Sequence, residues 1–318
     1  MIIGAKGVGF MGSAGGAPSS SISAYGSPTT ITGGNYPRIA GESDDRVFLI
    51  QSGTTSNIKR YQLTAGTWGI TNTWNSNDEG ITLGIGSVTC LGFGVTSKYA
   101  TLTAADGHVR IWEVTSGILS LLASVDTGGS VDGGAIFWNN FNTFSGDYLS
   151  TFDTYSGATG TYQQYSYNGT SSVSAVGSST AVVTGGYAGG ALCSYGPTSP
   201  SSIVSIAVGD KYLTFYNFNG SAWSTVGNPY FVDVKNLNFT VALVCLTTDR
   251  FLLAYTDSSN NTKLSVFSWN GTDFILHTGS LTIGTSMAHL SLARLTSTRV
   301  VFVNNTDMVM QAYNVTYS

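Results

Sequence analysis

Hydrophobic and polar positions alternate with a period of two in six segments that follow one another at intervals of ~50 residues. In each segment an aromatic residue is followed by a polar residue and then by an apolar one. Because successive side chains of a β-strand point to opposite faces, this period predicts one strand per segment. The six aromatic positions are Tyr61, Trp112, Tyr165, Tyr216, Phe267 and Tyr313.

Asn-Gly pairs follow three of these strands, at Asn168, Asn219 and Asn270, with a spacing of 51 residues in both intervals. Asn-Gly is a strong hairpin signal because both residues accept a positive φ. A segment rich in β-branched residues precedes each aromatic strand, and further short strands lie before and after this pair. Six units of four short strands predict an all-β fold, a six-bladed β-propeller with four antiparallel strands per blade.

The two ends of the chain complete this pattern. The sixth unit stops at Ser318, directly after its third strand, and the segment 21–31 aligns with the fourth strand at 274–283. We therefore predict that an N-terminal strand closes the last blade and covers its edge. Residues 20–318 form one propeller domain on this interpretation.

Residues 1–19 are a Gly- and Ser-rich N-terminal extension with two interpretations. One is a flexible tail, and the other is an anchor that becomes ordered against another subunit. The anchor interpretation rests on the apolar residues, which have no role in a solvated linker, and both interpretations stay open. The apolar residues that would make the attachment are Ile2, Ile3, Val8, Phe10 and Met11.

Charge and composition exclude several classes of partner. Only 9% of residues are charged and the net charge is −4, so the chain has no basic field for nucleic acid or for an anionic membrane surface. No apolar run approaches the ~18 residues of a membrane span, and we expect no membrane insertion. Cys90, Cys193 and Cys245 lie in separate apolar segments. Buried free thiols, formed in a reducing cytoplasm, are expected.

The sequence contains no evident catalytic set. His108, His277 and His289 lie in three different units and none has a metal-binding spacing, while most Asp residues occupy turn positions. We expect no catalysis, no metal and no cofactor. A pair of carboxylates contributed by distant units, as in a glycan depolymerase, stays open as an alternative.

Three segments that interrupt the repeat are candidates for ligand binding. Each places an aromatic residue near Asn, which offers a stacking face and amide hydrogen bonds to a neutral sugar. The alternative is that these residues fold back onto the scaffold. The candidate residues are Trp74, Asn75, Trp138, Asn139, Asn140, Phe141 and Tyr230.

Segments 295–303, 246–254 and 215–227 resemble the repeats of propeller proteins from bacteriophage tails and other virion surfaces. The resemblance covers roughly residues 20–318. It implies a virion component, such as a tail fibre or spike protein, that is located in the virion and can form homo-oligomers there. Its implied partners are other virion proteins, bound through the N-terminal extension, and a host-surface glycan or receptor.

The turn 219–223, with the pattern Asn-Gly-x-x-Trp, is similar to that of six-bladed fucose-binding lectins. Those lectins repeat an Arg and Glu pair with an aromatic residue in every blade. In this chain Arg46, Arg250 and Arg299 recur, but no Glu recurs with them. This resemblance implies a soluble carbohydrate-binding lectin as the alternative to a virion component.

Overall fold

The protein is all-β throughout the part of the chain that the computed structural model describes. The described ranges are 18–32, 34–52, 57–75, 87–91, 98–103, 107–116, 118–127, 133–138, 147–154, 159–184, 188–193, 201–207, 211–235 and 240–318. These ranges contain 25 strands and no helix. Within them, no helix is long and apolar enough to cross a membrane.

The described strands form six sheets, each built from strands consecutive in the chain except where the N-terminus joins the last sheet. Sheet 1 contains β2 (Asn35–Ser43), β3 (Arg46–Ser52), β4 (Asn57–Thr64) and β5 (Thr67–Asn75). Sheet 2 contains β6 (Ser87–Leu91), β7 (Lys98–Thr103), β8 (His108–Thr115) and β9 (Ile118–Asp126). Sheet 3 contains β10 (Gly133–Trp138), β11 (Asp147–Thr154), β12 (Thr159–Tyr167) and β13 (Val173–Thr184).

Sheets 4 to 6 continue the order. Sheet 4 contains β14 (Ala188–Cys193), β15 (Ser201–Ala207), β16 (Tyr212–Phe218) and β17 (Trp223–Phe231). Sheet 5 contains β18 (Val241–Cys245), β19 (Arg250–Thr256), β20 (Asn261–Trp269), β21 (Phe274–Leu276) and β22 (Leu281–Thr285). Sheet 6 contains β23 (Ser291–Thr296), β24 (Arg299–Val303), β25 (Val309–Tyr317) and β1 (Ser20–Thr30).

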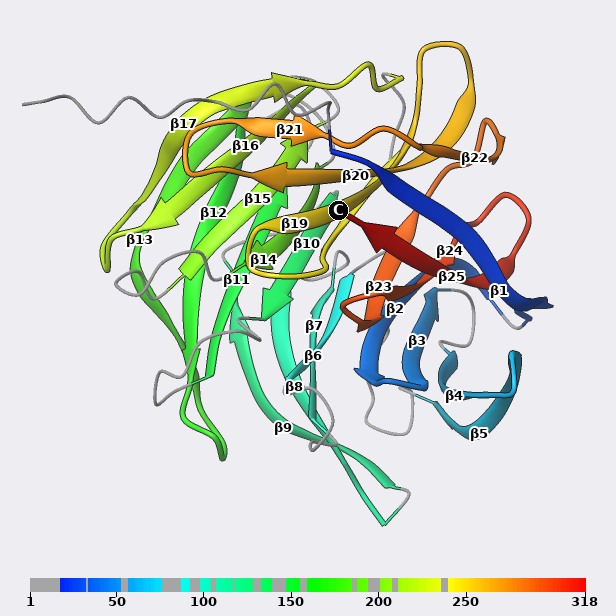
Figure 1. Cartoon of the computed structure of the whole chain (residues 1–318). Helices are drawn as coiled ribbons and strands as arrows, with labels where there is room; N and C mark the ends of the chain where they lie inside the picture. Colours follow the sequence, from blue (N-terminus) through cyan, green and yellow to red (C-terminus); the bar gives the residue numbers. More distant parts are fainter. Residues whose placement is uncertain are drawn as a thin grey trace, which may run out of the picture.

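The first strands of the sheets lie beside one another, as Figure 1 shows. β2 contacts β6, and the contacts continue from β6 to β10, β14, β18 and β23, which in turn contacts β2. Every first strand therefore has two neighbouring first strands, one in each adjacent sheet.

The N-terminal strand lies against the C-terminal one, drawn in blue and red in Figure 1. β1 and β25 pair antiparallel from Ser20 opposite Tyr317 to Thr30 opposite Val309. Ser19 also contacts the last residue, because its amide N donates to the Ser318 hydroxyl at 3.1 Å. The first and last described strands thus pair in one sheet.

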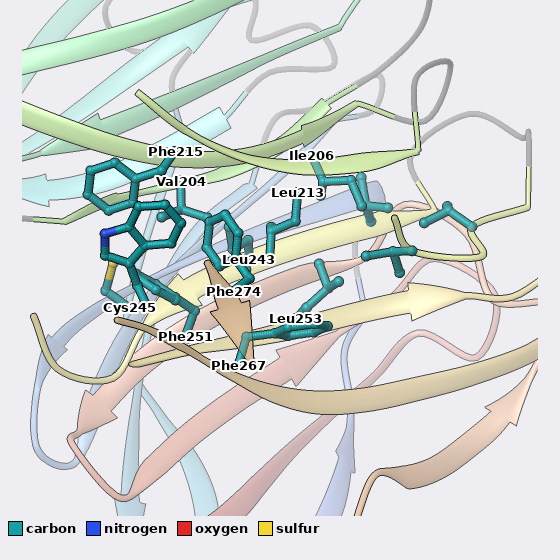
Figure 2. Packing of buried hydrophobic residues seen from close by; sticks show 14 residues of the cluster. Val204, Ile206, Leu213, Phe215, Leu243, Cys245, Phe251, Leu253, Phe267 and Phe274 are labelled. Carbon is teal, nitrogen blue, oxygen red and sulfur yellow. The ribbon is translucent and has the colours of Figure 1, made fainter. Parts of the chain in front are cut away.

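The aromatic positions of the third strands are buried between adjacent sheets, as their alternation predicts. Their exposed fractions range from 1% at Trp112 and Phe267 to 8% at Tyr313. Figure 2 shows Phe215, Cys245 and Phe251 in the cluster between sheets 4 and 5, where the Phe215 and Trp269 rings stack at 4.8 Å. Burial of Cys245, at 4% exposure, confirms one of the three predicted buried thiols.

The Asn-Gly turns form, but by a different mechanism from the predicted one. Only the glycine takes positive φ, +82° at Gly169, +98° at Gly220 and +101° at Gly271. The asparagine instead uses its side chain, since Asn168 Oδ1 accepts bonds from the backbone N atoms of three following residues at 3.0 Å. These are Asx-type turns, in which a side-chain oxygen replaces a backbone acceptor.

The fourth strand of sheet 5 departs from the predicted single strand. It is divided into β21 and β22, which both pair with β20. The backbone between them remains attached, because His277 N donates to Val266 O at 2.9 Å.

Four glycines with positive φ lie where the fourth strand of one sheet contacts the adjacent sheet. They are Gly26, Gly177, Gly227 and Gly279. A Cβ on any of them would lie 1.9–2.4 Å from a carbonyl oxygen of the adjacent sheet. The residues after the first three donate their N–H to these carbonyls, as Ser27 N does to Gly66 O at 3.0 Å. We call these contacts the glycine clasps.

Candidate functional site

One end of the sheets, which we call the turn end, carries the turns after the third strands. Four sheets begin their second strand there with a basic residue, namely Arg46, Lys98, Arg250 and Arg299. Strand register places a polar residue of the third strand directly opposite each of them. The opposite residues are Gln62, Glu113, Ser268 and Asn314, respectively.

Arg250 has the most complete set of neighbours. Its Nη1 lies 3.0 Å from both carboxylate oxygens of Asp249, and its guanidinium lies 5.1 Å from the centre of the Tyr317 ring. The side chains of Arg250 and Asp249 are 29% and 36% exposed, so solvent reaches both charges. Tyr317 belongs to sheet 6, and the cluster therefore spans the junction between sheets 5 and 6.

His277 lies beside this cluster and contacts polar groups of sheet 5 and of the residue before β1. His277 Nε2 lies 3.1 Å from the Ser268 hydroxyl and its Nδ1 lies 3.3 Å from Ser19 O. Burial lowers the pKa of His277, and the charge of Arg250 lowers it further. Burial also raises the pKa of Tyr317, so both groups are neutral at pH 7.

Arg299 and Lys98 have related surroundings. The Arg299 guanidinium lies 3.9 Å from the Tyr25 ring centre, and its Nε donates to Asn314 Oδ1 at 3.0 Å. Lys98 Nζ lies 5.5 Å from the Tyr167 ring centre, donates to Gly169 O at 2.7 Å and pairs with Glu113 at 3.9 Å. Tyr167 is only 2% exposed, whereas Tyr25 is half-buried.

Arg46 shares the Asp-Arg sequence of the Arg250 cluster but differs in its neighbours. It lies 4.0 Å from Asp45, and both side chains are close to half exposed. Burial raises the pKa of Asp45, but hydrogen bonds from Gln62 and Ser43 and the charge of Arg46 outweigh this and lower it. Lys98 of sheet 2 lies against the Tyr167 ring of sheet 3. The equivalent position in sheet 2, the sheet that follows Arg46, holds Val114, which has no aromatic ring.

The chemistry of the Arg250 cluster suits a polyhydroxylated ligand. A carboxylate accepts hydrogen bonds from hydroxyl groups, a guanidinium donates several in a fixed fork, and an aromatic ring packs against a C–H face. The cluster therefore combines an acceptor, a donor and a stacking surface at one accessible junction.

An Arg–Glu pair that the sequence pattern does not reveal lies between sheets 1 and 2. Arg60 Nη2 lies 2.8 Å from Glu42 Oε1 and 2.9 Å from the Tyr99 hydroxyl, and the guanidinium lies 5.4 Å from the Trp74 ring centre. The side chains of Arg60 and Glu42 are only 16% and 9% exposed. This burial makes the pair a part of the packing between the two sheets.

The predicted ligand-binding residues that the structure describes are not brought together. Trp74 is 8% exposed and packs 6.0 Å from Phe48, and Tyr230 is half-buried with its ring 5.4 Å from Phe267. Both side chains therefore pack onto the scaffold. Asn75 is the last residue of β5. A ligand-binding role for these residues stays a prediction.

Trp138 lies at the opposite end of the sheets from Trp74 and Tyr230. It ends a first strand, at the turn end, whereas Trp74 and Tyr230 lie near the opposite end of their fourth strands. Asn139, Asn140 and Phe141 lie outside the described residues. The attachment residues Ile2, Ile3, Val8, Phe10 and Met11 lie outside them as well.

Metal ligands do not cluster in the part of the chain described. No group of three or more His, Cys, Asp or Glu side chains there has a metal-binding arrangement.

Comparison with known proteins identifies the fold and no family. No family model and no curated protein matches the sequence. Solved structures do match. The SapL1 lectin, in complex with alpha methyl fucoside, has a TM-score of 0.58 and 14% identity, covering 91% of this chain and 96% of the lectin.

Two further structures show the same likeness. The fucose-specific lectin from Aleuria aurantia has a TM-score of 0.55 and 9% identity over 95% of both chains. A protein from Bacteroides uniformis designated a 6-phosphogluconolactonase has a TM-score of 0.58 and 11% identity, over 87% of this chain and 80% of that one. At these identities the likeness shows the fold alone, which is a β-propeller as the sequence predicts.

Proposed function

We propose that this protein is a non-enzymatic carbohydrate-binding β-propeller, with a neutral sugar bound at the turn end by Arg250, Asp249 and Tyr317. The observation that supports this most strongly is the cluster itself, a partly exposed cation and carboxylate beside an aromatic ring of the next sheet. The structural likeness to two fucose-binding lectins favours a sugar ligand.

The proposal includes six blades and closure by the N-terminal strand. The six sheets, the cyclic contacts of their first strands and the pairing of β1 with β25 support both features. In the proposed site the carboxylate comes from Asp249, the residue before Arg250, so the site needs no Glu.

A glycan array with the full chain tests the proposal. Arg250→Ala removes the donor and leaves Asp249 without its cationic partner, so we expect binding of the preferred neutral glycan to weaken at least tenfold. Arg46→Ala is the matched control, because it also removes an exposed arginine that follows an Asp. Equal binding by wild type and Arg250→Ala would contradict the proposed site.

Catalysis and biological setting are tested separately. A depolymerase would shorten the polysaccharide that it binds, whereas we expect the chain length of a bound glycan to stay constant. A location on a phage particle stays a prediction, and detection of the protein in purified particles would test it.

A further inference from the structure

A second cluster lies at the other end of the sheets, where three segments of sheets 1 and 6 meet. Tyr36 is the second residue of β2, His289 precedes β23, and Asn305 lies between β24 and β25. The Tyr36 and His289 rings are 4.4 Å apart and inclined at 59°, and both side chains are half-buried. Two ring surfaces thus reach solvent side by side.

The backbone that presents these rings is strained. Tyr36 has φ = +50° and His289 has φ = +52°, a left-handed conformation that bulky residues rarely adopt. Hydrogen bonds hold it in place, since Tyr36 N donates to Asn305 Oδ1 at 2.9 Å and Asn305 N donates to Ala288 O at 3.1 Å. Such strain clusters at sites where side chains must be oriented for function.

A buried cation contacts the backbone of His289. Arg38 is 7% exposed, and its Nη1 donates to Pro37 O at 3.1 Å and to His289 O at 3.3 Å. Burial lowers the pKa of Arg38 to about 10, so it stays charged at pH 7. Burial and the charge of Arg38 together lower the pKa of His289 to about 4. The imidazole is therefore neutral and lies in a positive field.

We propose that Tyr36, Arg38 and His289 form a binding site for a sugar acid, whose carboxylate is attracted by Arg38 while its ring covers the tyrosine and imidazole faces. A neutral imidazole and a tyrosine hydroxyl each supply a hydrogen-bond donor for the carboxylate. A guanidinium in a poorly solvated place attracts an anion more strongly than an exposed one. This site is independent of the neutral-sugar site proposed for the turn end.

Calorimetry on the full chain tests the proposal with glucuronate, glucose, acetate and phosphate as probes. We expect glucuronate to bind one site, acetate to bind more weakly because it lacks the ring, and glucose not to bind there. Arg38→Gln removes the charge and should weaken glucuronate binding at least tenfold. Arg46→Gln makes the same charge change on an exposed arginine and should leave binding unchanged. Phosphate binding as strong as glucuronate binding would overturn the sugar-acid assignment.

NMR of the wild-type imidazole keeps the test valid if Arg38→Gln does not fold. A bound carboxylate stabilises the protonated form of His289, so saturation with glucuronate should raise its pKa. An unchanged His289 pKa at saturating glucuronate would refute the site. Loss of neutral-glycan binding in Arg250→Ala would not affect this result, so the two proposals fail separately.

Discussion

The glycine clasps make a sharp prediction about stability, which Gly26→Ala tests at the junction between the N-terminal strand and sheet 1. A Cβ at this position would lie 1.9 Å from Gly66 O and 2.6 Å from Gly66 C. These are backbone atoms of a turn and have no side-chain rotamer to change. The strand must therefore move away from the turn, and the bond from Ser27 N to Gly66 O is lost.

The cost of Gly26→Ala follows from two contributions. Alanine at φ = +70° is disfavoured by roughly 1–2 kcal/mol. Loss of one backbone hydrogen bond costs about 1 kcal/mol more. The free energy of unfolding should therefore fall by about 2–3 kcal/mol. At roughly 2–4 °C per kcal/mol, Tm should fall by about 4–12 °C.

Two other glycines are matched controls, measured by the same thermal and urea unfolding. Gly169 has φ = +82° but no atom within 4 Å of its Cβ position, so Gly169→Ala should cost only about 1–2 kcal/mol. Gly69 has neither a positive φ nor a close neighbour, and Gly69→Ala should be neutral or stabilising by up to ~1 kcal/mol. A Gly26→Ala variant as stable as Gly69→Ala would refute the clasp.

Three further perturbations test the packing and the charges. Deleting residues 20–27 should lower Tm sharply, because it exposes the edge of β25, and an unchanged Tm would contradict closure by this strand. Glu42→Gln should destabilise by about 3–5 kcal/mol in urea unfolding, because Arg60 stays buried without its counter-charge, and the double variant with Arg60→Met should recover part of this loss. Asp257 pairs with Lys263 at 2.6 Å; burial raises the pKa of Asp257, but hydrogen bonds from Lys263 and Asn261 outweigh this and lower it. Wild type should therefore exceed Asp257→Asn in stability above about pH 4, and the difference should diminish as pH falls through the folded-state pKa; a difference that does not change with pH would contradict this.

Much of the scaffold could be predicted because it depends on local patterns. Alternation at Tyr61 and its equivalents reports which face is buried, and the Asn-Gly pairs report where the chain turns. The prediction that residues 21–31 complete the last unit came from comparing segments at the same repeat position, and β1 pairs with β25 there.

The clasps and the candidate sites depend on contacts between sheets, which the sequence does not display. Gly26 resembles any turn glycine until Gly66 O is seen beside its Cα. Glu42 and Arg60 lie 18 residues apart on different strands, so neither spacing nor period joins them. Arg250 recurs in the sequence with Arg46 and Arg299, but its ring partner Tyr317 comes from another sheet.

Exposure distinguishes the aromatic residues of the interrupted segments from those of the candidate sites. Trp74 is next to Asn75 in the chain, as a sugar platform would require, yet its ring packs on Phe48. Tyr36 and His289 lie 253 positions apart and become neighbours only when sheet 6 packs on sheet 1. Local sequence cannot distinguish these two outcomes.

A crystal structure of the full chain with the preferred neutral glycan from the array tests the central claim most directly. The account predicts a sugar at the junction of sheets 5 and 6, with hydroxyl groups within hydrogen-bond distance of Arg250 and Asp249 and a C–H face toward Tyr317. A glycan bound at another position, with the Arg250 cluster unchanged, would contradict it.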